Sequence, residues 1–230
     1  MNELLKKFSR QFLAATVKVE SWKHIENYLE ELFKREIHDK AALHKWLLDL
    51  SELISVVYEE GTTREVAMTC HTDDEELKNR HFDFVENIDS PFKEAVFKLY
   101  QKFLAHPLSA QLGVESQQLI LMIKTEVELF SEKNIPLEVS EAKLCQHYQE
   151  ITGSWMVSFE DKEYTMPEMA VFLESNNAKL RENAFKAMAS RRIQDQDQLN
   201  TLFSNLLVLR EQIAANVGLN GYRDYLFKQN

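Results

Sequence analysis

The sequence is poor in glycine and proline, the two residues that most often interrupt helices and form turns. Only five glycines and four prolines occur among 230 residues. A chain with so few turn formers favours long helices over a succession of short strands. We therefore expect an all-α fold, a multi-helix array of antiparallel helices.

The chain also lacks an excess of positive charge and any long apolar run. It carries 27 Lys and Arg against 37 Asp and Glu, a net charge of −10. An acidic surface repels phosphate backbones and anionic lipids, so we expect no nucleic-acid partner and no membrane partner. No run approaches the roughly 18 apolar residues of a membrane span. The N-terminal apolar stretch is too short and interrupted for a secretory signal.

Cysteine is nearly absent from the chain. The two cysteines, Cys70 and Cys145, lie far apart, and neither belongs to a CxxC pair. We therefore expect two reduced, partly buried thiols in a protein of cytoplasmic location.

The apolar residues recur at spacings of three and four, as on one face of a helix. Ser21 and Asp39 are expected to be N-caps of the first two helices. Gly61 is expected to break the second helix, and Pro91 to start a later one after Ser90. The sequence NIPL at 134–137 is expected to close a helix that begins near Ser116.

A small β-hairpin is expected near 154–165, because apolar and polar residues alternate there around a turn at 160–162. Thr165 and Glu168 form a capping box that begins a helix directly afterwards. Two long helices should follow, separated near the QDQDQ stretch at 194–198, with Gly218 as the residue that ends the second. The apolar residues expected to face the core from this second helix are Leu199, Leu202, Phe203, Leu206, Leu209 and Ile213.

A soft boundary is expected where helix breakers gather around His106, Pro107 and Gly113. It divides the chain into an N-terminal helical region, 1–112, and a second helical region with the hairpin, 113–230.

The segment CHTDDEE at 70–76 gathers residue types that bind metals. His71 and Glu75 are four residues apart, which would place them on one helical face. The spacing matches neither a calcium loop nor a zinc site with four ligands. Acidic residues at a helix start are expected from the helix dipole alone, and we favour this structural interpretation. A metal enzyme that uses His71, His81 and the acids between them is the least favoured hypothesis.

Other catalytic patterns are missing. No histidine has a second histidine four residues on, as an HExxH zinc site requires, and no GxSxG or phosphate-binding loop occurs. His147 has Glu150 three residues on, which is a pairing far commoner on surfaces than in metal sites. We therefore predict no catalytic and no metal-binding residue in this chain, and its substrate-binding residues stay unknown.

Several segments in linear order carry a family resemblance. They are KAALHKWLLDLSEL, MTCHTDDEE, ELFSEKNIPLEVSE, a hairpin with KEYT, a helix with LRENAF and SRR, then LREQIAANVG and YRDYLF. In this order they resemble the N-terminal half of the oligoendopeptidase F family, in the thimet-oligopeptidase clan of zinc metallopeptidases. The resemblance covers roughly residues 12–229.

The resemblance implies a function that this chain carries only in part. Members of the family bind zinc through an HExxH helix and a further Glu, and that region does not occur here. What the resemblance implies for this chain is the N-terminal, substrate-channel-forming part of a zinc metalloendopeptidase that hydrolyses short oligopeptides. The chain alone would then be inactive and bind no zinc, and its partners would be the missing catalytic half and oligopeptide substrates.

A different hypothesis is a stand-alone helical module that binds a peptide or a protein without catalysis. Codons downstream of Asn230 that encode HExxH would favour the peptidase. The final segment, NVGLNGYRDYLFKQN, favours it too, because Tyr222, Tyr225 and Leu226 would form an apolar face with nothing after it to pack on. We interpret this ending as a cut.

Overall fold

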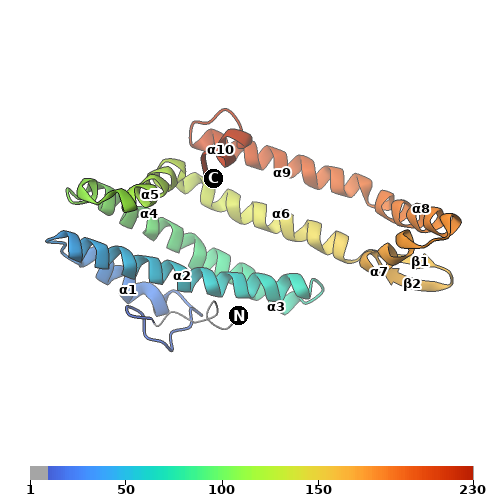
Figure 1. Cartoon of the computed structure of the whole chain (residues 1–230), viewed down its shortest axis with the longest axis horizontal. Coiled ribbons are helices and arrows are strands. Elements are labelled where there is room, and N and C mark those ends of the chain that lie inside the picture. The colour runs from blue at the N-terminus through green and yellow to red at the C-terminus, as the bar shows by residue number, and fades with distance from the viewer. Residues whose placement is uncertain (1–9, 230) are drawn as a thin grey trace. The chain divides into compact units, whose positions relative to one another are not determined.

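The computed structural model describes residues 10–229 as helices joined by short connections, with a small two-stranded hairpin (Figure 1). The expected all-α class with one hairpin is confirmed for these residues. Two compact units can be distinguished. Unit 1 holds the described residues up to Ile135 and those from Ala214 onward, and unit 2 holds Pro136–Ile213. This division concerns contacts within the folded chain, and the regions 1–112 and 113–230 stay a prediction.

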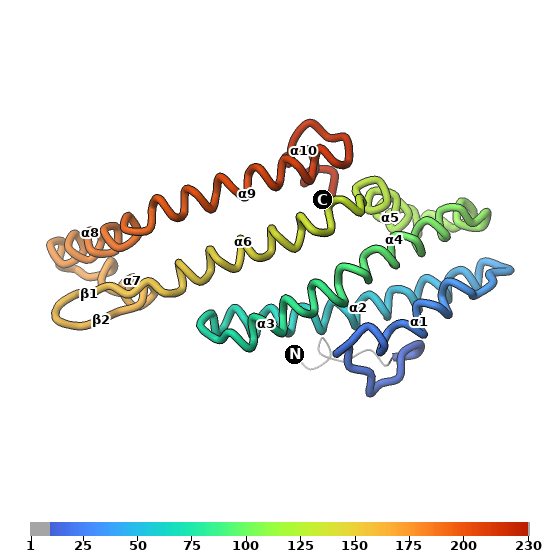
Figure 2. Tube along the Cα trace, turned by 180° about the vertical axis from the view of Figure 1, so that it is seen from behind, coloured from blue at the N-terminus to red at the C-terminus, as the bar shows by residue number. Residues whose placement is uncertain are grey.

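Unit 1 is a set of long helices with short helical turns between them. Its helices are α1 (Lys23–Lys34), α2 (Lys40–Cys70), α3 (Glu75–Phe84), α4 (Ser90–Ala105), α5 (Gln117–Leu129) and α10 (Tyr222–Gln229). The short turns are the π-helix η1 (Val85–Asp89) and the 3₁₀ turns η2 (Ser109–Gln111), η3 (Val114–Ser116) and η4 (Glu132–Asn134). Figures 1 and 2 show α2 and α4 running in opposite directions, with α1 beside them.

The core of unit 1 is formed by one apolar face from each of α1, α2, α4 and α5. Trp46 and Phe103 lie at its centre, fully buried, with their rings stacked at 6.4 Å between centroids. The indole Nε1 of Trp46 donates to the carbonyl of Leu32 at 2.9 Å. A buried indole N–H therefore has a partner, as the cost of burying a polar group demands.

Helix α2 is longer than the sequence predicts, because Gly61 does not break it. The helix runs without interruption from Lys40 to Cys70. A Cβ atom at position 61 would lie 3.1 Å from Cε1 of Phe84. The glycine thus permits close approach of α3 to α2, and packing overrides its weak helix propensity. The start of α2 is as predicted, since the Asp39 side chain accepts from the backbone N–H of Ala42 at 2.8 Å.

Two further helix boundaries differ from the predictions. Ser21 is not a cap, because α1 begins at Lys23 with Trp22 before it and no side-chain hydrogen bond at its start. The sequence at 134–137 does not close a helix but opens α6 (Ile135–Gly153). Pro136 lies in the first turn of α6, where its missing N–H has no cost.

Helix α4 begins at Ser90 with Pro91 in its first turn, as predicted, but the helical backbone continues into it from α3 through η1. Asp89, before Ser90, already has helical backbone angles. A proline inside a helix leaves a carbonyl without its donor, and π-turns are a common way to accommodate this. The hydroxyl of Ser90 donates to the carbonyl of Val85 at 2.8 Å, inside this turn. His106 and Pro107 end α4 at Ala105 as predicted.

Unit 2 contains α6 and, after it, the hairpin and three further helices. These elements are β1 (Met156–Phe159), β2 (Lys162–Thr165), α7 (Met166–Ala170), the 3₁₀ turn η5 (Val171–Glu174), α8 (Ala178–Gln194) and α9 (Gln196–Asn216). The strands pair antiparallel, with Val157 opposite Tyr164. Glu160 and Asp161 between them both have positive φ, as a two-residue hairpin turn requires.

The caps in unit 2 follow the sequence. Thr165 and Glu168 form the predicted capping box at the start of α7. Asn177 accepts from two backbone N–H groups at the start of α8, and the predicted break separates α8 from α9. Leu202, Leu206 and Ile213 are buried as predicted. Phe203 is not, since 57% of its surface is exposed.

The end of α9 and the helix after it belong to unit 1. Gly218 has φ of +77°, and the N–H groups of Gly218 and Leu219 donate back to the carbonyls of Ala215 and Ala214, which is a Schellman ending. Helix α10 packs on α5, and Lys228 pairs with Glu128 at 2.7 Å.

The prediction that the last helix has nothing to pack on is therefore wrong for Tyr225. This side chain is buried and stacks with Tyr222, while Leu226 stays partly exposed. Throughout residues 10–229, no helix combines the length and apolar character needed to cross a membrane.

Candidate functional site

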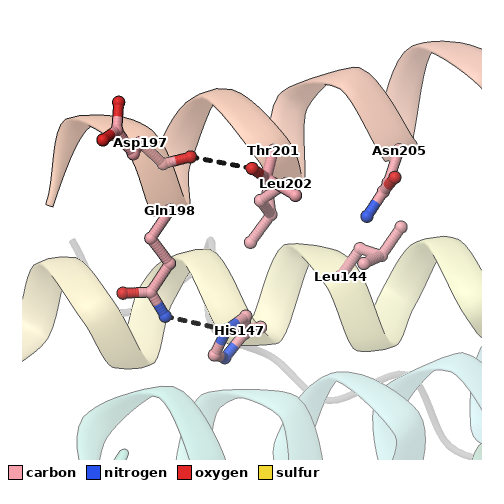
Figure 3. Close-up of a pocket in the computed structure, with 7 residues that line it drawn as sticks. All are labelled: Leu144, His147, Asp197, Gln198, Thr201, Leu202 and Asn205. Carbon is pink, nitrogen blue, oxygen red and sulfur yellow. Dashed lines mark hydrogen bonds between the residues drawn. The ribbon is translucent and has the colours of Figure 1, made fainter.

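An open groove lies on unit 2 between α6 and α9, which run side by side (Figures 2 and 3). Its volume is about 440 Å³. The residues that line it are Leu144 and His147 of α6, and Asp197, Gln198, Thr201, Leu202 and Asn205 of α9. Most of the lining surface is apolar. This is the usual chemistry of a site that holds an apolar group and orients it by a few hydrogen bonds.

The groove exists because α6 and α9 share an apolar seam. Ile151 of α6 is buried with Leu202 and Leu206 of α9. The two α9 residues are four apart, so both lie on the face toward α6. Arg210 and Glu141 add an ion pair between the same helices, with Nε and Oε1 at 2.6 Å. The apolar contact and the ion pair thus hold α6 and α9 together along the groove.

His147 connects the two walls of the groove. Its Nε2 lies 3.3 Å from the amide nitrogen of Gln198 (Figure 3). Its Nδ1 lies 3.3 Å from a carboxylate oxygen of Glu150. An amide NH₂ donates and a carboxylate accepts, so these contacts suit the His147 tautomer that accepts at Nε2 and donates from Nδ1. Both ring nitrogens are then occupied, and the predicted pairing of His147 with Glu150 is confirmed as a contact between side chains.

One polar group of the α9 wall already forms a hydrogen bond within its own helix. The hydroxyl of Thr201 donates to the backbone carbonyl of Asp197 at 2.9 Å (Figure 3). Asn205 also lines the groove, and Figure 3 shows its amide near Leu144. No nucleophile lies beside a base among these lining residues. The described side chains of the groove therefore do not form a catalytic pair.

The segment 70–76 does not form the metal-ligand group that its composition suggests. His71 ends α2 as its C-cap residue, while Glu75 begins α3, so they do not share a helical face as expected. Asp74 caps α3 by accepting from the N–H groups of Glu76 and Leu77. The favoured structural interpretation is confirmed for Asp74, since its carboxylate serves the helix start.

The histidines at 71 and 81 differ in their surroundings. His71 is exposed, whereas His81 is 8% exposed and lies within α3. Among the residues described, no group of three or more His, Cys, Asp or Glu could hold a metal ion. The prediction that this chain has no catalytic and no metal-binding residue is not tested by that finding and stays a prediction.

The two cysteines are free thiols. Cys145 is partly buried as expected, and burial raises the pKa of its thiol. Cys70 is exposed, contrary to the expectation, because it is the last residue of α2 and lies at the surface of unit 1.

Helix α9 has a second apolar face, directed away from α6. We define the α9 apolar face as Phe203, Leu207 and Val208, which are 57%, 45% and 74% exposed. Phe203 and Leu207 are four residues apart and therefore adjacent on the helix, whereas Val208 lies further around it. A helix that is apolar on two sides is typical of one that packs on two sides.

The groove residues could not be singled out from the sequence. Leu144 and Asn205 are 61 residues apart, and each is an ordinary helix residue by itself. Only the antiparallel return of α9 along α6 brings them together. The one sequence signal was the predicted pairing of His147 with Glu150.

The sequence model of the peptidase M3 N-terminal domain matches residues 6–130. No curated protein matches the chain.

Solved structures resemble the fold of nearly the whole chain. An oligoendopeptidase F solved at 3.1 Å matches with a TM-score of 0.79 and 21% identity, covering 97% of this chain and 39% of its own. An oligoendopeptidase F from Bacillus anthracis strain Ames gives 0.82 and 15%, covering 96% and 41%. PZ peptidase A, solved with an inhibitor, gives 0.79 and 19%, covering 97% and 39%. The chain thus spans about two fifths of the length of these proteins.

Proposed function

Because the chain belongs to the peptidase M3 family, we propose that it is the N-terminal, substrate-channel-forming part of a zinc metalloendopeptidase that hydrolyses short oligopeptides. The observation that carries this proposal is that residues 6–130 match the N-terminal domain of that family. The fold agrees with it, since 97% of the chain matches 39% of an oligoendopeptidase F. In this proposal the HExxH helix and the chemistry belong to a part of the enzyme that this chain does not contain.

The α9 apolar face supports the proposal. Phe203 and Val208 are more than half exposed, although large apolar side chains are usually buried when a partner is at hand. Contiguous exposed apolar surface marks an interface. We propose that the catalytic half of the enzyme covers this face and is the main partner of the chain.

Zinc is the metal that the family implies, and the described residues do not fit it. A catalytic zinc needs three protein ligands within about 2.3 Å of the ion. Residues 10–229 contain no group of three candidate ligands. We therefore assign no step of the hydrolysis to residues of this chain.

The contribution proposed for this chain is to bind and align the substrate. The groove between α6 and α9 offers an apolar floor at Leu144 and Leu202 and hydrogen-bonding groups at Gln198 and Asn205. An extended peptide could place one apolar side chain on that floor. Holding a peptide in one orientation lowers the entropic part of the barrier for a catalyst nearby.

The other partners and the location follow from charge and cysteine usage. A net charge of −10 disfavours nucleic acids and anionic membranes as partners. The free thiols of Cys70 and Cys145 suit a reducing compartment. We propose oligopeptides as the substrates and the cytoplasm as the location.

Two measurements test whether chemistry resides in this chain. The purified 230-residue protein should contain no stoichiometric zinc by elemental analysis. It should also leave a quenched fluorescent oligopeptide intact. Cleavage that a metal chelator abolishes, in a preparation free of other peptidases, would overturn the proposal.

A third experiment tests the groove. Benzoylphenylalanine in place of Asn205 should crosslink to a labelled oligopeptide, whereas the same group in place of the exposed Arg192 on α8 should not. Photocrosslinking captures weak complexes, so a low affinity does not hide the result. Equal labelling at both positions would refute a peptide site in the groove.

The groove also favours a second candidate function, a stand-alone module that binds a peptide or protein without catalysis. The two functions differ in what covers the α9 apolar face. For a stand-alone module, labelled peptides should bind with the α9 apolar face still accessible to solvent. For the peptidase part, adding the catalytic half should protect Phe203 and Leu207 from solvent.

A further inference from the structure

His81 is a titratable side chain buried in unit 1 without a partner for one of its ring nitrogens. Only 8% of its surface is exposed, and its Nδ1 is buried with no hydrogen bond. Other buried polar groups of this unit are satisfied: Asp49 accepts from Arg35, and Asn134 accepts from Asn216. A buried polar atom without a partner carries a desolvation cost, so its environment needs an explanation.

The surroundings of His81 disfavour a positive charge. Burial lowers the pKa of its imidazole below the usual 6.5, and Glu65 of α2 and Asp89 of η1 offset this only in part. Arg64 of α2 lowers it further. Asp89 is itself paired with Lys93 at 3.1 Å, which weakens its attraction for the ring.

Arg64 is held close to His81 by several contacts. Its Nη1 donates to the carbonyl of Arg80, the residue before His81, at 3.2 Å. Its Nε pairs with Glu60 at 2.9 Å, and its guanidinium lies 5.1 Å from the centre of the Phe84 ring. A cation is therefore held near His81, but its pairing with Glu60 balances part of its charge, and burial of the ring is the larger cause of the lowered pKa.

The helix that carries His81 changes geometry directly after it. The N–H of Val85 is shared between the carbonyls of His81 and Phe82, and η1 begins there. Hydrogen bonds of π-helices are rarer and often occur where a helix must adapt. The segment that would respond to a charge on His81 is thus attached to an irregular turn.

From this arrangement we propose that the contact between α2 and the segment Glu75–Asp89 is a pH-sensitive latch, which protonation of His81 opens at mildly acidic pH. The opened segment exposes His81 to water together with Phe84 and Ile88, which close one side of the core that contains Trp46. This inference concerns unit 1 and holds whether or not the proposed peptidase function is correct.

The direction of the pH effect on the latch follows from proton linkage. His81 binds a proton less readily in the closed form than in the opened form. The closed form therefore becomes less stable as pH falls below the pKa that His81 has in the opened form. If the pKa of His81 in the opened form is about 6.5, the ratio of closed to opened form falls up to about tenfold between about pH 7.5 and pH 5.5. Above that range no further change is expected.

Hydrogen exchange of the full chain tests the latch. Amide protection in residues 75–89, corrected for the intrinsic exchange rate at each pH, should fall up to about tenfold from about pH 7.5 to pH 5.5. In His81→Gln this fall should vanish. The control is His71→Gln, which replaces an exposed histidine at the end of α2. In this variant the fall in amide protection should remain. Equal losses in the wild type and His81→Gln would overturn the proposal.

A second measurement keeps the test valid if His81→Gln does not fold. The ring protons of His81 can be titrated by NMR in the wild-type chain. An apparent pKa below about 6.5, with exchange broadening of Phe82 and Phe84 in the same pH range, is expected. Titration at or above that value would overturn the proposal.

Discussion

Ion pairs inside unit 1 link the end of α1 to α2. Asp49 is 2% exposed and accepts from Arg35 at 2.7 Å and from Lys45. Arg35 also pairs with Glu31, and these two acids raise the pKa of its guanidinium, with the bond to Glu31 the largest cause. Removing one partner from such a buried pair leaves a charge uncompensated, which is why these residues matter individually.

Lys102 of α4 closes the C-terminal end of α1. Its ammonium donates to the carbonyls of Leu32, Phe33 and Arg35 at 3.0, 2.8 and 2.9 Å. The last carbonyls of a helix lack intrahelical donors and carry partial negative charge. We expect Lys102→Met to lower the free energy of unfolding by about 1–3 kcal/mol.

Urea unfolding followed by circular dichroism measures this change. The control is Lys98→Met on the same helix, which removes an exposed pair with Glu94 and should cost less than about 0.5 kcal/mol. Equal effects of the two substitutions would contradict a capping role for Lys102.

Glu52 of α2 binds the segment before α1 through its backbone. Its carboxylate accepts from the N–H groups of Gln11, Phe12 and Leu13 at 2.8, 3.0 and 2.7 Å. Burial opposes its ionisation, but the three donors outweigh this, so the pKa of Glu52 lies below its usual 4.5. The stabilisation is therefore full above about pH 4.5 and is lost as pH falls through the folded pKa.

We expect the stability gap between the wild type and Glu52→Gln to be constant near neutral pH. It should shrink below about pH 4.5, because the protonated wild type resembles the variant. Urea midpoints from about pH 7 to pH 3 measure both proteins. A gap that does not change with pH would show that Glu52 acts without its charge.

At the scale of elements, the contact of α2 with α3 depends on a glycine. Ala at position 61 would favour the helix by about 1 kcal/mol. Its Cβ would also lie 3.1 Å from Cε1 of the buried Phe84, whose ring is fixed under Arg64. Overpacking costs about 1–3 kcal/mol, so we expect Gly61→Ala to destabilise the chain.

A double-mutant cycle separates the two effects. In a Phe84→Leu background the clash is relieved, and Gly61→Ala should then stabilise relative to Phe84→Leu alone. Thermal unfolding of the four proteins gives the coupling. Destabilisation by Gly61→Ala in both backgrounds would mean that Phe84 is not the obstacle.

At the scale of the whole molecule, the exposed apolar side chains of α9 are the feature that a folded protein seldom leaves uncovered. We expect the purified chain to bind a hydrophobic dye or to self-associate through the α9 apolar face. Phe203→Ser combined with Leu207→Ser should reduce both. Since the two side chains are exposed, stability should change by less than about 0.5 kcal/mol per substitution.

Dye fluorescence and sedimentation velocity measure this prediction. Val114→Ser provides the control, because Val114 is 78% exposed but lies in η3 of unit 1. A monomeric wild type that binds no dye would contradict an uncovered interface. So would an equal effect of the control substitution.

Local chemistry accounts for the features that the sequence predicted well. Asp39 and the Thr165 capping box act on backbone groups within three residues, so their effects can be read directly from the chain. The hairpin follows from alternation around a two-residue turn. At these positions residues close in sequence decide the outcome, and the predictions are confirmed.

Predictions that depended on distant neighbours were wrong. Gly61 continues a helix because Phe84 packs against it, and Tyr225 is buried in a helix that packs on α5. Phe203 shares the apolar period of α9 but lies on its other side. The groove between α6 and α9 and the burial of His81 likewise arise from contacts between segments far apart in sequence.

Propensity, periodicity and motif order act over short distances, so the all-α class, most caps, the hairpin and the resemblance to a peptidase family could be predicted from the sequence. Contacts between distant segments set which apolar face of α9 is covered, which histidine is buried, and where a groove opens. Burial is a property of the packed chain, since a helix with two apolar sides does not specify which side meets a neighbour. The candidate sites of this protein were therefore decided by packing.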